Sequence, residues 1–107
     1  MAFESVRVIS GRYKGHKLAE VGKETAKSGL RPTGAKVREA LFNILINGSL
    51  GDVVSGARVL DLFAGTGTLG IEAVSRGADF ACLIDIGQVA MQLIRKTWIF
   101  WKIQAIF

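Results

Sequence analysis

Polar and apolar residues alternate near the amino terminus, along the stretch SVRVISGRYKGHKLAEV (5–21). A period of two is typical of strands, and Gly11 and Gly15 interrupt it as turn residues do. The next stretch, GKETAKSG (22–29), has the composition of a loop. The pattern therefore predicts a basic N-terminal β-hairpin followed by a loop over residues 1–30.

The apolar spacing becomes helical after residue 33. The residues at this spacing are Val37, Leu41, Ile44, Leu45 and Gly48. Pro32 and Thr33 suit a helix start, with Thr33 as its cap, and NGSLGD (47–52) suits a helix end. We expect one helix between these two signals.

Apolar runs and amphipathic stretches alternate in the remainder of the chain. ARVLDLF (57–63) and FACLIDI (80–86) predict buried strands, while TLGIEAVSRG (68–77) and QVAMQLIRK (88–96) predict helices. Strand, helix, strand, helix indicates a parallel sheet with crossover helices, the doubly wound α/β class. We assign residues 31–96 to this unit.

Composition limits the class of protein. Half of the 107 residues are hydrophobic, which suits one small folded domain. The single cysteine, Cys82, excludes an internal disulfide, and the single histidine, His16, argues against a metal site. No stretch has the ~18 apolar residues that cross a bilayer, and residues 1–10 lack the layout of a signal peptide. A cytoplasmic protein without a membrane partner is expected.

The net charge of +5 is concentrated at the amino-terminal end. Residues 1–38 hold nine Lys and Arg against three acids, whereas residues 39–107 hold five against six. Such a surface either contacts the phosphates of a nucleic acid or is simply solvated, and charge alone does not separate the two.

A glycine-rich turn joins the first predicted strand to its helix. Gly65, Gly67 and Gly70 fit the spacing G-x-G-x-x-G, and Asp85 follows Gly67 by 18 residues at the end of the next strand. This spacing is that of a dinucleotide site, in which the acid binds the ribose. A tight connection without a ligand is the other interpretation.

Asp61 changes the preferred ligand because it stands at the end of the strand, just before the turn. A carboxylate there would repel a pyrophosphate at close range. S-adenosylmethionine has no phosphate, and its ammonium and sulfonium groups are stabilised by a nearby carboxylate. The sequence therefore favours S-adenosyl-L-methionine over a dinucleotide.

Three segments together resemble a known family. RVISGRYKGHKL, GLRPTGAKVREALFNIL and VLDLFAGTGTLGIEAVSRGA, in this order and spacing, are similar to the amino-terminal half of the bacterial small-subunit ribosomal RNA (guanine-N2)-methyltransferases, the RsmD type. The resemblance covers roughly residues 7–96. It implies a Rossmann-like fold with an N-terminal β-hairpin, and transfer of a methyl group from S-adenosylmethionine to N2 of a guanine in ribosomal RNA of the small subunit.

The resemblance also implies roles for individual residues. Those that would hold the cofactor are Asp61, Phe63, Gly65 and Gly67 at its methionine end, Asp85 on its ribose, and Arg31, Pro32 and Thr33 in a loop near it. Those that would contact RNA phosphates are Arg12, Lys14 and Lys17. Gly87 departs from the family, whose members often carry an acid at this position, two residues after the one that binds the ribose. For Arg38 and Glu39 we prefer a surface ion pair, and for Phe42 core packing.

The family's chemistry depends on a later motif, Asn or Asp followed by Pro-Pro and Phe or Tyr. This chain has one proline, Pro32, so no catalytic residue is assigned and the chain is expected to be a truncated, inactive form. Its end, KTWIFWKIQAIF (96–107), lacks the polar pattern of the family. A one-nucleotide deletion in the gene would explain residues 97–107. If one adenine is added to one possible codon choice for residues 96–107, the new reading frame encodes KNMDILENTSYF, which has the polar pattern of the family.

Two other functions stay open. One is a non-catalytic module that binds RNA or S-adenosylmethionine with a partner chain, and the other is a fragment of an NAD-dependent oxidoreductase. The expected partner is ribosomal RNA or the small ribosomal subunit. An open sheet edge and the apolar tail also predict self-association.

Overall fold

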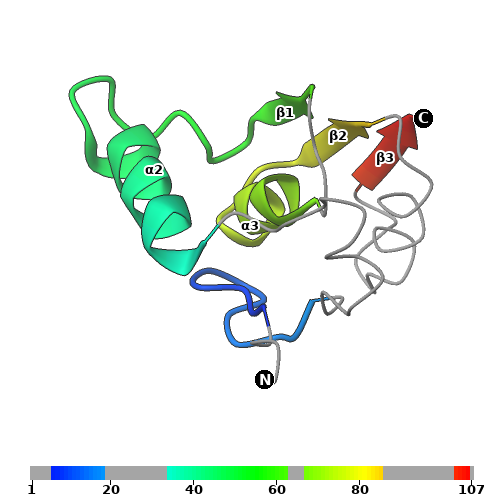
Figure 1. Cartoon of the computed structure of the whole chain (residues 1–107). Helices are drawn as coiled ribbons and strands as arrows, with labels where there is room; N and C mark the ends of the chain where they lie inside the picture. The colour runs from blue at the N-terminus through cyan, green and yellow to red at the C-terminus, as the bar shows by residue number, and fades with distance from the viewer. Residues whose placement is uncertain (1–5, 19–33, 63–66, 86–102, 107) are drawn as a thin grey trace.

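The computed structural model describes residues 6–18, 34–62, 67–85 and 103–106. Within them the chain forms two helices and a three-stranded sheet (Figure 1). The elements, in chain order, are α2 (Ala35–Asn47), β1 (Arg58–Asp61), α3 (Thr68–Ser75), β2 (Phe80–Ile84) and β3 (Ile103–Ile106). The α/β class predicted from the sequence is therefore correct.

The sheet has the order β1-β2-β3, and both pairings are parallel. Arg58 lies opposite Phe80, and Asp61 lies opposite Leu83. Helix α3 makes the crossover between β1 and β2 and packs against both (Figure 1). The predicted strand, helix, strand order over residues 57–86 is confirmed by this unit.

Helix α3 lies very close to the sheet because Gly70 has no side chain. A Cβ at this position would stand 2.3 Å from Leu83 Cδ2. Seven of the eight residues of α3 are buried. The helix ends at Ser75, followed by Gly77 with φ 112°, a conformation that favours glycine and that agrees with the predicted stop.

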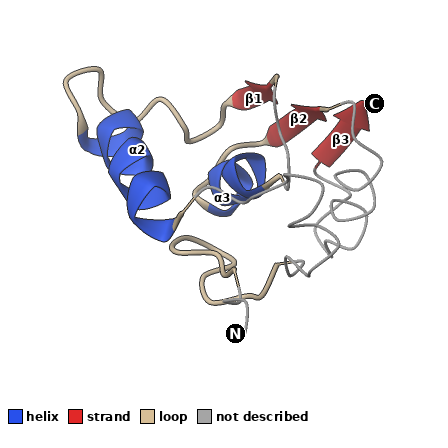
Figure 2. Ribbon diagram, viewed as in Figure 1, coloured by secondary structure: helices blue, strands red, loops and turns tan. Residues whose placement is uncertain are grey.

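Helix α2 lies beside α3 and the first strand (Figure 2). Phe42 is its buried apolar anchor and packs with Val54, Ala73 and Ala78. The prediction of Thr33 as the cap is wrong. The helix begins at Ala35, and its cap residue is Gly34, which has an extended backbone and no side chain that could form a capping hydrogen bond. Glycine is tolerated at this position because it costs only a few tenths of a kcal/mol relative to a polar cap.

The N-terminal segment folds back on itself, but it forms no strand within residues 6–18. One antiparallel bridge, between Arg7 and Lys17, stands where two strands were expected. Backbone hydrogen bonds from Val8 N to His16 O and from Leu18 N to Val6 O close the loop. We call residues 6–18 the basic turn.

The tail contributes a third strand that the sequence did not predict. Residues 103–106 pair with β2, with Ala81 opposite Ile103 and Ile84 opposite Ile106. The sequence predicted two strands in this part of the chain. The structure has three, and β2 pairs with β1 on one side and with β3 on the other. The predicted helix over residues 88–96 lies outside the described residues.

Candidate functional site

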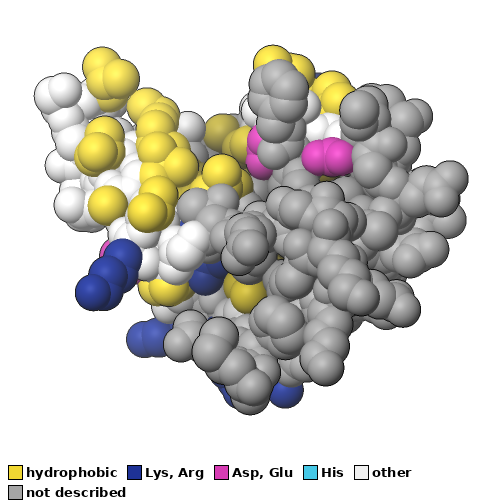
Figure 3. Space-filling model, viewed as in Figure 1, with side chains coloured by type: hydrophobic (Ala, Val, Ile, Leu, Met, Phe, Trp, Pro, Cys, Tyr) yellow, Lys and Arg dark blue, Asp and Glu magenta, His cyan; other side chains and the backbone are white. Residues whose placement is uncertain are grey.

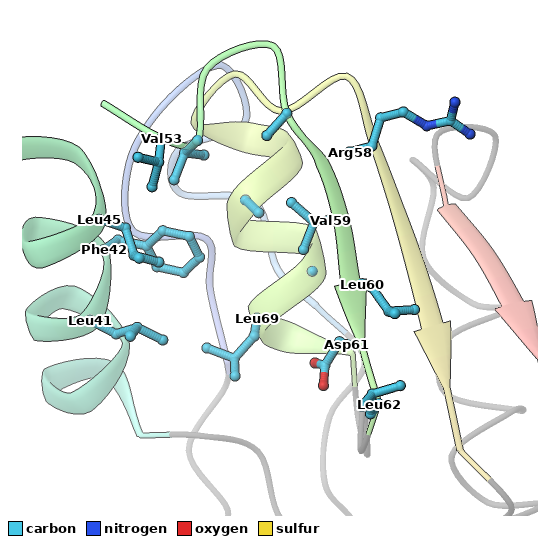
Figure 4. Close-up of a pocket in the computed structure, with 14 residues that line it drawn as sticks. Leu41, Phe42, Leu45, Val53, Arg58, Val59, Leu60, Asp61, Leu62 and Leu69 are labelled. Carbon is cyan, nitrogen blue, oxygen red and sulfur yellow. The ribbon is translucent and has the colours of Figure 1, made fainter. Parts of the chain in front are cut away.

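The two predicted acidic ligands lie at the carboxyl ends of neighbouring parallel strands. Asp61 is the last residue of β1 and lies opposite Leu83, two residues before Asp85. The carboxyl ends of parallel strands are where open α/β sheets bind ligands. Figure 4 shows the Asp61 carboxylate on the side of its strand that faces Leu69 of α3.

Gly67 forms the last part of the turn before α3. It is buried, has φ 81° and ψ 6°, and occupies the cap position of that helix. The left-handed conformation favours glycine, which accounts for a glycine at this position of the turn. The first backbone N–H groups of α3 point out of the helix start, where they can donate to a polar group.

Five of the predicted cofactor residues cannot be placed. Phe63 and Gly65 belong to the turn, and Arg31, Pro32 and Thr33 to the segment before α2; all five lie outside the described residues. Asp61, Gly67 and Asp85 are therefore the predicted cofactor residues that the structure brings to one edge.

The predicted RNA-binding residues lie together on the basic turn. Arg12, Lys14 and Lys17 are exposed. The Arg12 guanidinium lies 5.5 Å from the centre of the ring of Tyr13, a residue of the core, within the range of a cation–π interaction. Figure 3 shows Lys and Arg side chains along the part of the molecule where the turn lies.

Helix α3 fixes the basic turn through its last residue. The Ser75 hydroxyl donates to Ser10 O (2.7 Å) and accepts from Tyr13 N (3.0 Å), and Ser75 O accepts from Arg12 N (2.8 Å). Gly11 permits this approach, because a Cβ there would stand 2.0 Å from Ser75 O. The phosphate-binding candidates are thus attached directly to the helix that begins at the glycine turn.

Glu72 is a second attachment point, and the sequence analysis missed it. Its carboxylate accepts hydrogen bonds from Ile9 N (3.0 Å), Ser10 N (3.1 Å) and Arg76 Nε (2.9 Å). Arg38 Nε of α2 lies 3.2 Å from Glu72 Oε1. The signal in the sequence was an acid inside the apolar helix TLGIEAVS, because a buried carboxylate requires partners.

The expected surface ion pair between Arg38 and Glu39 is wrong. Arg38 is 2 % exposed and faces Glu72, whereas Glu39 pairs with Arg76 (3.0 Å). Adjacent helical residues point in different directions, so an i,i+1 pair has no shared face. Phe42 is a core residue, as expected, and Arg76 also lies 4.9 Å from the centre of its ring.

Burial destabilises the charged form of the Arg38 side chain. Desolvation lowers the pKa of the guanidinium, the Glu72 carboxylate acts in the opposite direction, and nearby Arg76 lowers it further. Arg38 Nη2 donates to Arg7 O, while Nη1 has no partner among the described residues. Arg38 thus connects α2, α3 and the basic turn at an energetic cost.

The described ranges, 6–18, 34–62, 67–85 and 103–106, show neither a metal site nor a membrane-spanning helix. These residues contain no group of three or more His, Cys, Asp or Glu side chains able to hold a metal ion. No helix among them is long and apolar enough to cross a membrane.

Known proteins resemble this chain over most of its length. The family described as Conserved hypothetical protein 95 matches residues 6–106. The ribosomal RNA small subunit methyltransferase D of Escherichia coli is 44 % identical over 92 residues, covering 85 % of this chain and 42 % of that protein. YlbH of Bacillus subtilis is 43 % identical over 91 residues, covering 85 % of this chain and 45 % of its own length.

The fold agrees with this relationship. The solved structure of Escherichia coli yhhF superposes with a TM-score of 0.75 and 33 % identity, over 96 % of this chain and 52 % of that one. The chain thus spans less than half the length of the two curated relatives. It belongs to the Conserved hypothetical protein 95 family, together with the ribosomal RNA small subunit methyltransferases D.

Proposed function

We propose that this chain supplies the cofactor-binding and RNA-binding part of an S-adenosylmethionine-dependent methyltransferase that acts on guanine N2 in small-subunit ribosomal RNA. The observation that carries the proposal is the position of Asp61 and Asp85 after neighbouring parallel strands, with Gly67 opening α3 beside them. The names of the curated relatives support the methyl transfer and the ribosomal RNA.

The residues at this edge fit S-adenosylmethionine chemically. The Asp61 carboxylate would bind the ammonium of the methionine end, and Asp85 would accept hydrogen bonds from the ribose hydroxyls. Phe63 and Gly65 would complete the turn, and Arg31, Pro32 and Thr33 would approach from the segment before α2. When bound, the cofactor supplies an electrophilic methyl group.

Binding, and not transfer, is the activity expected of these 107 residues alone. These residues do not contain the Asn or Asp-Pro-Pro motif, since Pro32 is their single proline. Arg12, Lys14 and Lys17 would neutralise RNA phosphates, which positions RNA without reading its sequence.

Calorimetry with S-adenosylhomocysteine tests the cofactor part. We expect binding by the chain and at least tenfold weaker binding by Asp61→Asn, because a hydrogen bond to a charged group contributes about 1.5–3 kcal/mol. Asp79→Asn is the matched control, since Asp79 is exposed and precedes β2 at the opposite edge. Binding of NAD without S-adenosylhomocysteine would favour the oxidoreductase alternative and overturn the proposal.

The tail has its own test. We propose that residues 97–107 arise from a one-nucleotide deletion, and the backbone pairing of 103–106 with β2 leaves that proposal open. Sequencing of the locus beyond the stop codon decides it. A methyltransferase remainder in another frame is expected, and its absence would contradict the deletion.

A further inference from the structure

A shallow groove lies between the basic turn and the first part of α2. Its volume is about 490 Å³, within the range of about 300–1,000 Å³ that small-ligand sites have. Figure 1 shows the basic turn, drawn in blue, next to the start of α2. Neither Asp61 nor Asp85 lines this groove, so it is separate from the candidate cofactor site. The residues that line it are Ile9, Ala35, Lys36, Glu39, Ala40 and Asn43.

The lining combines apolar and polar side chains. Three of the six residues are apolar, and two of these are alanines, whose small side chains leave room for a flat ring. The other three are exposed and supply a cation, a carboxylate and an amide: Lys36, Glu39 and Asn43. An apolar surface with a few polar groups that fix orientation is typical of a small-ligand site.

The amide of Asn43 and the carboxylate of Glu39 each keep hydrogen-bonding capacity for a ligand. Asn43 Oδ1 accepts a hydrogen bond from Asn47 Nδ2 (3.0 Å), so Asn43 Nδ2 can donate elsewhere. Glu39 Oε2 accepts from Arg76 Nη2 (3.0 Å), and Glu39 Oε1 is not needed for that bond. Residues four apart on a helix are neighbours, so a donor and an acceptor stand side by side, as on the Watson–Crick edge of a base.

Buried polar contacts hold the two sides of the groove together. Arg38 Nη2 on α2 donates to Arg7 O of the basic turn (2.6 Å). The Glu72 carboxylate accepts a hydrogen bond from Ile9 N (3.0 Å), and both Arg38 and Glu72 are buried. A groove that is already formed loses less conformational freedom on binding than one that must be assembled.

We infer that this groove binds one unpaired base of the RNA whose phosphates contact the basic turn. The inference rests on the proposed function, which assigns the phosphate contacts. Ile9 lies between Arg7 and Arg12 in the sequence, so RNA on the basic turn passes the groove. Proteins recognise RNA mainly in single-stranded segments, whose bases turn outward and form hydrogen bonds on their Watson–Crick edges. The phosphate contacts position the RNA, and the groove adds a contact to a base.

Filter binding with two forms of RNA tests the inference. One probe is a single-stranded oligonucleotide from small-subunit ribosomal RNA, and the other is the same strand paired with its complement, which occupies the Watson–Crick edges. Asn43→Ala is expected to weaken binding to the single strand about fivefold, the effect of one hydrogen bond, and to leave binding to the duplex unchanged. An equal loss on both probes would overturn the inference.

Asn47→Ala is the matched control. It removes the same hydrogen bond between Asn43 and Asn47, but Asn47 does not line the groove. Both affinities should therefore stay as they are in the unaltered chain, and a loss equal to that of Asn43→Ala would contradict the inference. Circular dichroism checks that both variants keep their helices.

A second variant closes the groove without removing a polar group. Ala40 is exposed on α2, so Ala40→Leu fills part of the groove and leaves the core unchanged. We expect it, too, to weaken binding to the single strand and not to the duplex. Unchanged binding of the single strand would overturn the inference.

The same measurements separate this inference from the proposed function. If the unaltered chain binds neither probe, the RNA-binding part of the proposed function fails, and the inference fails with it. If the chain binds both probes but Asn43→Ala and Ala40→Leu bind them equally well, the inference alone fails.

Discussion

The guanidinium of Arg38 on α2 and the carboxylate of Glu72 on α3 form an ion pair of 3.2 Å inside the protein, with the two side chains 2 % and 1 % exposed. The same carboxylate accepts two backbone N–H groups of the basic turn. One pair of residues thus connects α2, α3 and the basic turn.

Removing one member of this pair is expected to be costly. Arg38→Met leaves the buried Glu72 carboxylate with one cation fewer, and breaking a buried pair costs about 3–5 kcal/mol of the free energy of unfolding. Lys36→Met, an exposed change on the same helix, is expected to stay within about 0.5 kcal/mol. Chemical denaturation measures both, and equal stability of the two variants would show that the pair has no structural role.

The double variant Arg38→Met/Glu72→Gln separates the pair from its surroundings. Since the second change removes the charge that the first left uncompensated, we expect the double variant to lose less stability than the sum of the two single variants. An additive result would mean that Arg38 and Glu72 act independently.

Gly11 and Gly15 make a matched test of the contact between the basic turn and α3. Both have positive φ, 89° and 84°, so alanine at either position costs about 1–2 kcal/mol of backbone strain. A Cβ at Gly15 meets nothing within 4 Å, whereas one at Gly11 meets Ser75 O. Gly11→Ala is therefore expected to lower the free energy of unfolding more than twice as much as Gly15→Ala, as measured by urea denaturation.

The salt dependence of RNA binding tests the role of the basic turn. If Lys14 contacts a phosphate, Lys14→Ala weakens binding to ribosomal RNA and reduces the slope of log K against log salt by about one. Arg58→Ala is the control, because Arg58 is exposed and belongs to β1, outside the basic turn. Filter binding at several salt concentrations gives both slopes, and an unchanged slope for Lys14→Ala would remove this residue from the interface.

Asp52 provides a pH-dependent test in the loop after α2. Hydrogen bonds from the backbone N–H groups of Ser55 and Val54 hold the pKa of its carboxyl below the usual 3.8. Because the folded pKa is lowered, its contribution to stability is present above pH 3.8 and is lost as the pH falls through the folded value. Tm measured against pH should therefore show a difference between the protein and Asp52→Ala at pH 6 that shrinks toward pH 3.

Local sequence features predicted the helices and strands whose own pattern is recognisable. They did not predict contacts between residues that are distant in the sequence. The apolar runs and the turn glycines located β1, α3 and β2, because each element buries a recognisable pattern. Arg76 is a local partner of Glu72, but its other partners, Arg38, Ile9 and Ser10, lie 34 or more residues away, so no local pattern indicated them. The strand at 103–106 was missed because its pairing with β2 depends on tertiary contact and not on its own composition.

At the candidate site, too, local patterns were predictable and contacts between distant residues were not. The sequence predicted that Asp61, Gly67 and Asp85 would lie at one end of the sheet, because strand ends and a glycine turn have fixed positions in an α/β unit. Their role in cofactor binding stays a prediction. The family resemblance predicted RNA contacts for Arg12, Lys14 and Lys17, and that role stays a prediction. The attachment of their segment to α3 through Ser75 had no signal in the sequence.

The attachment of the basic turn to α3 also orders events during synthesis. The anchors of residues 6–18, Glu72 and Ser75, are translated about 60 residues after the backbone groups that they bind. Contacts between such distant residues form slowly, because the loop between them must first close. The basic turn therefore stays unanchored until most of this chain has been made.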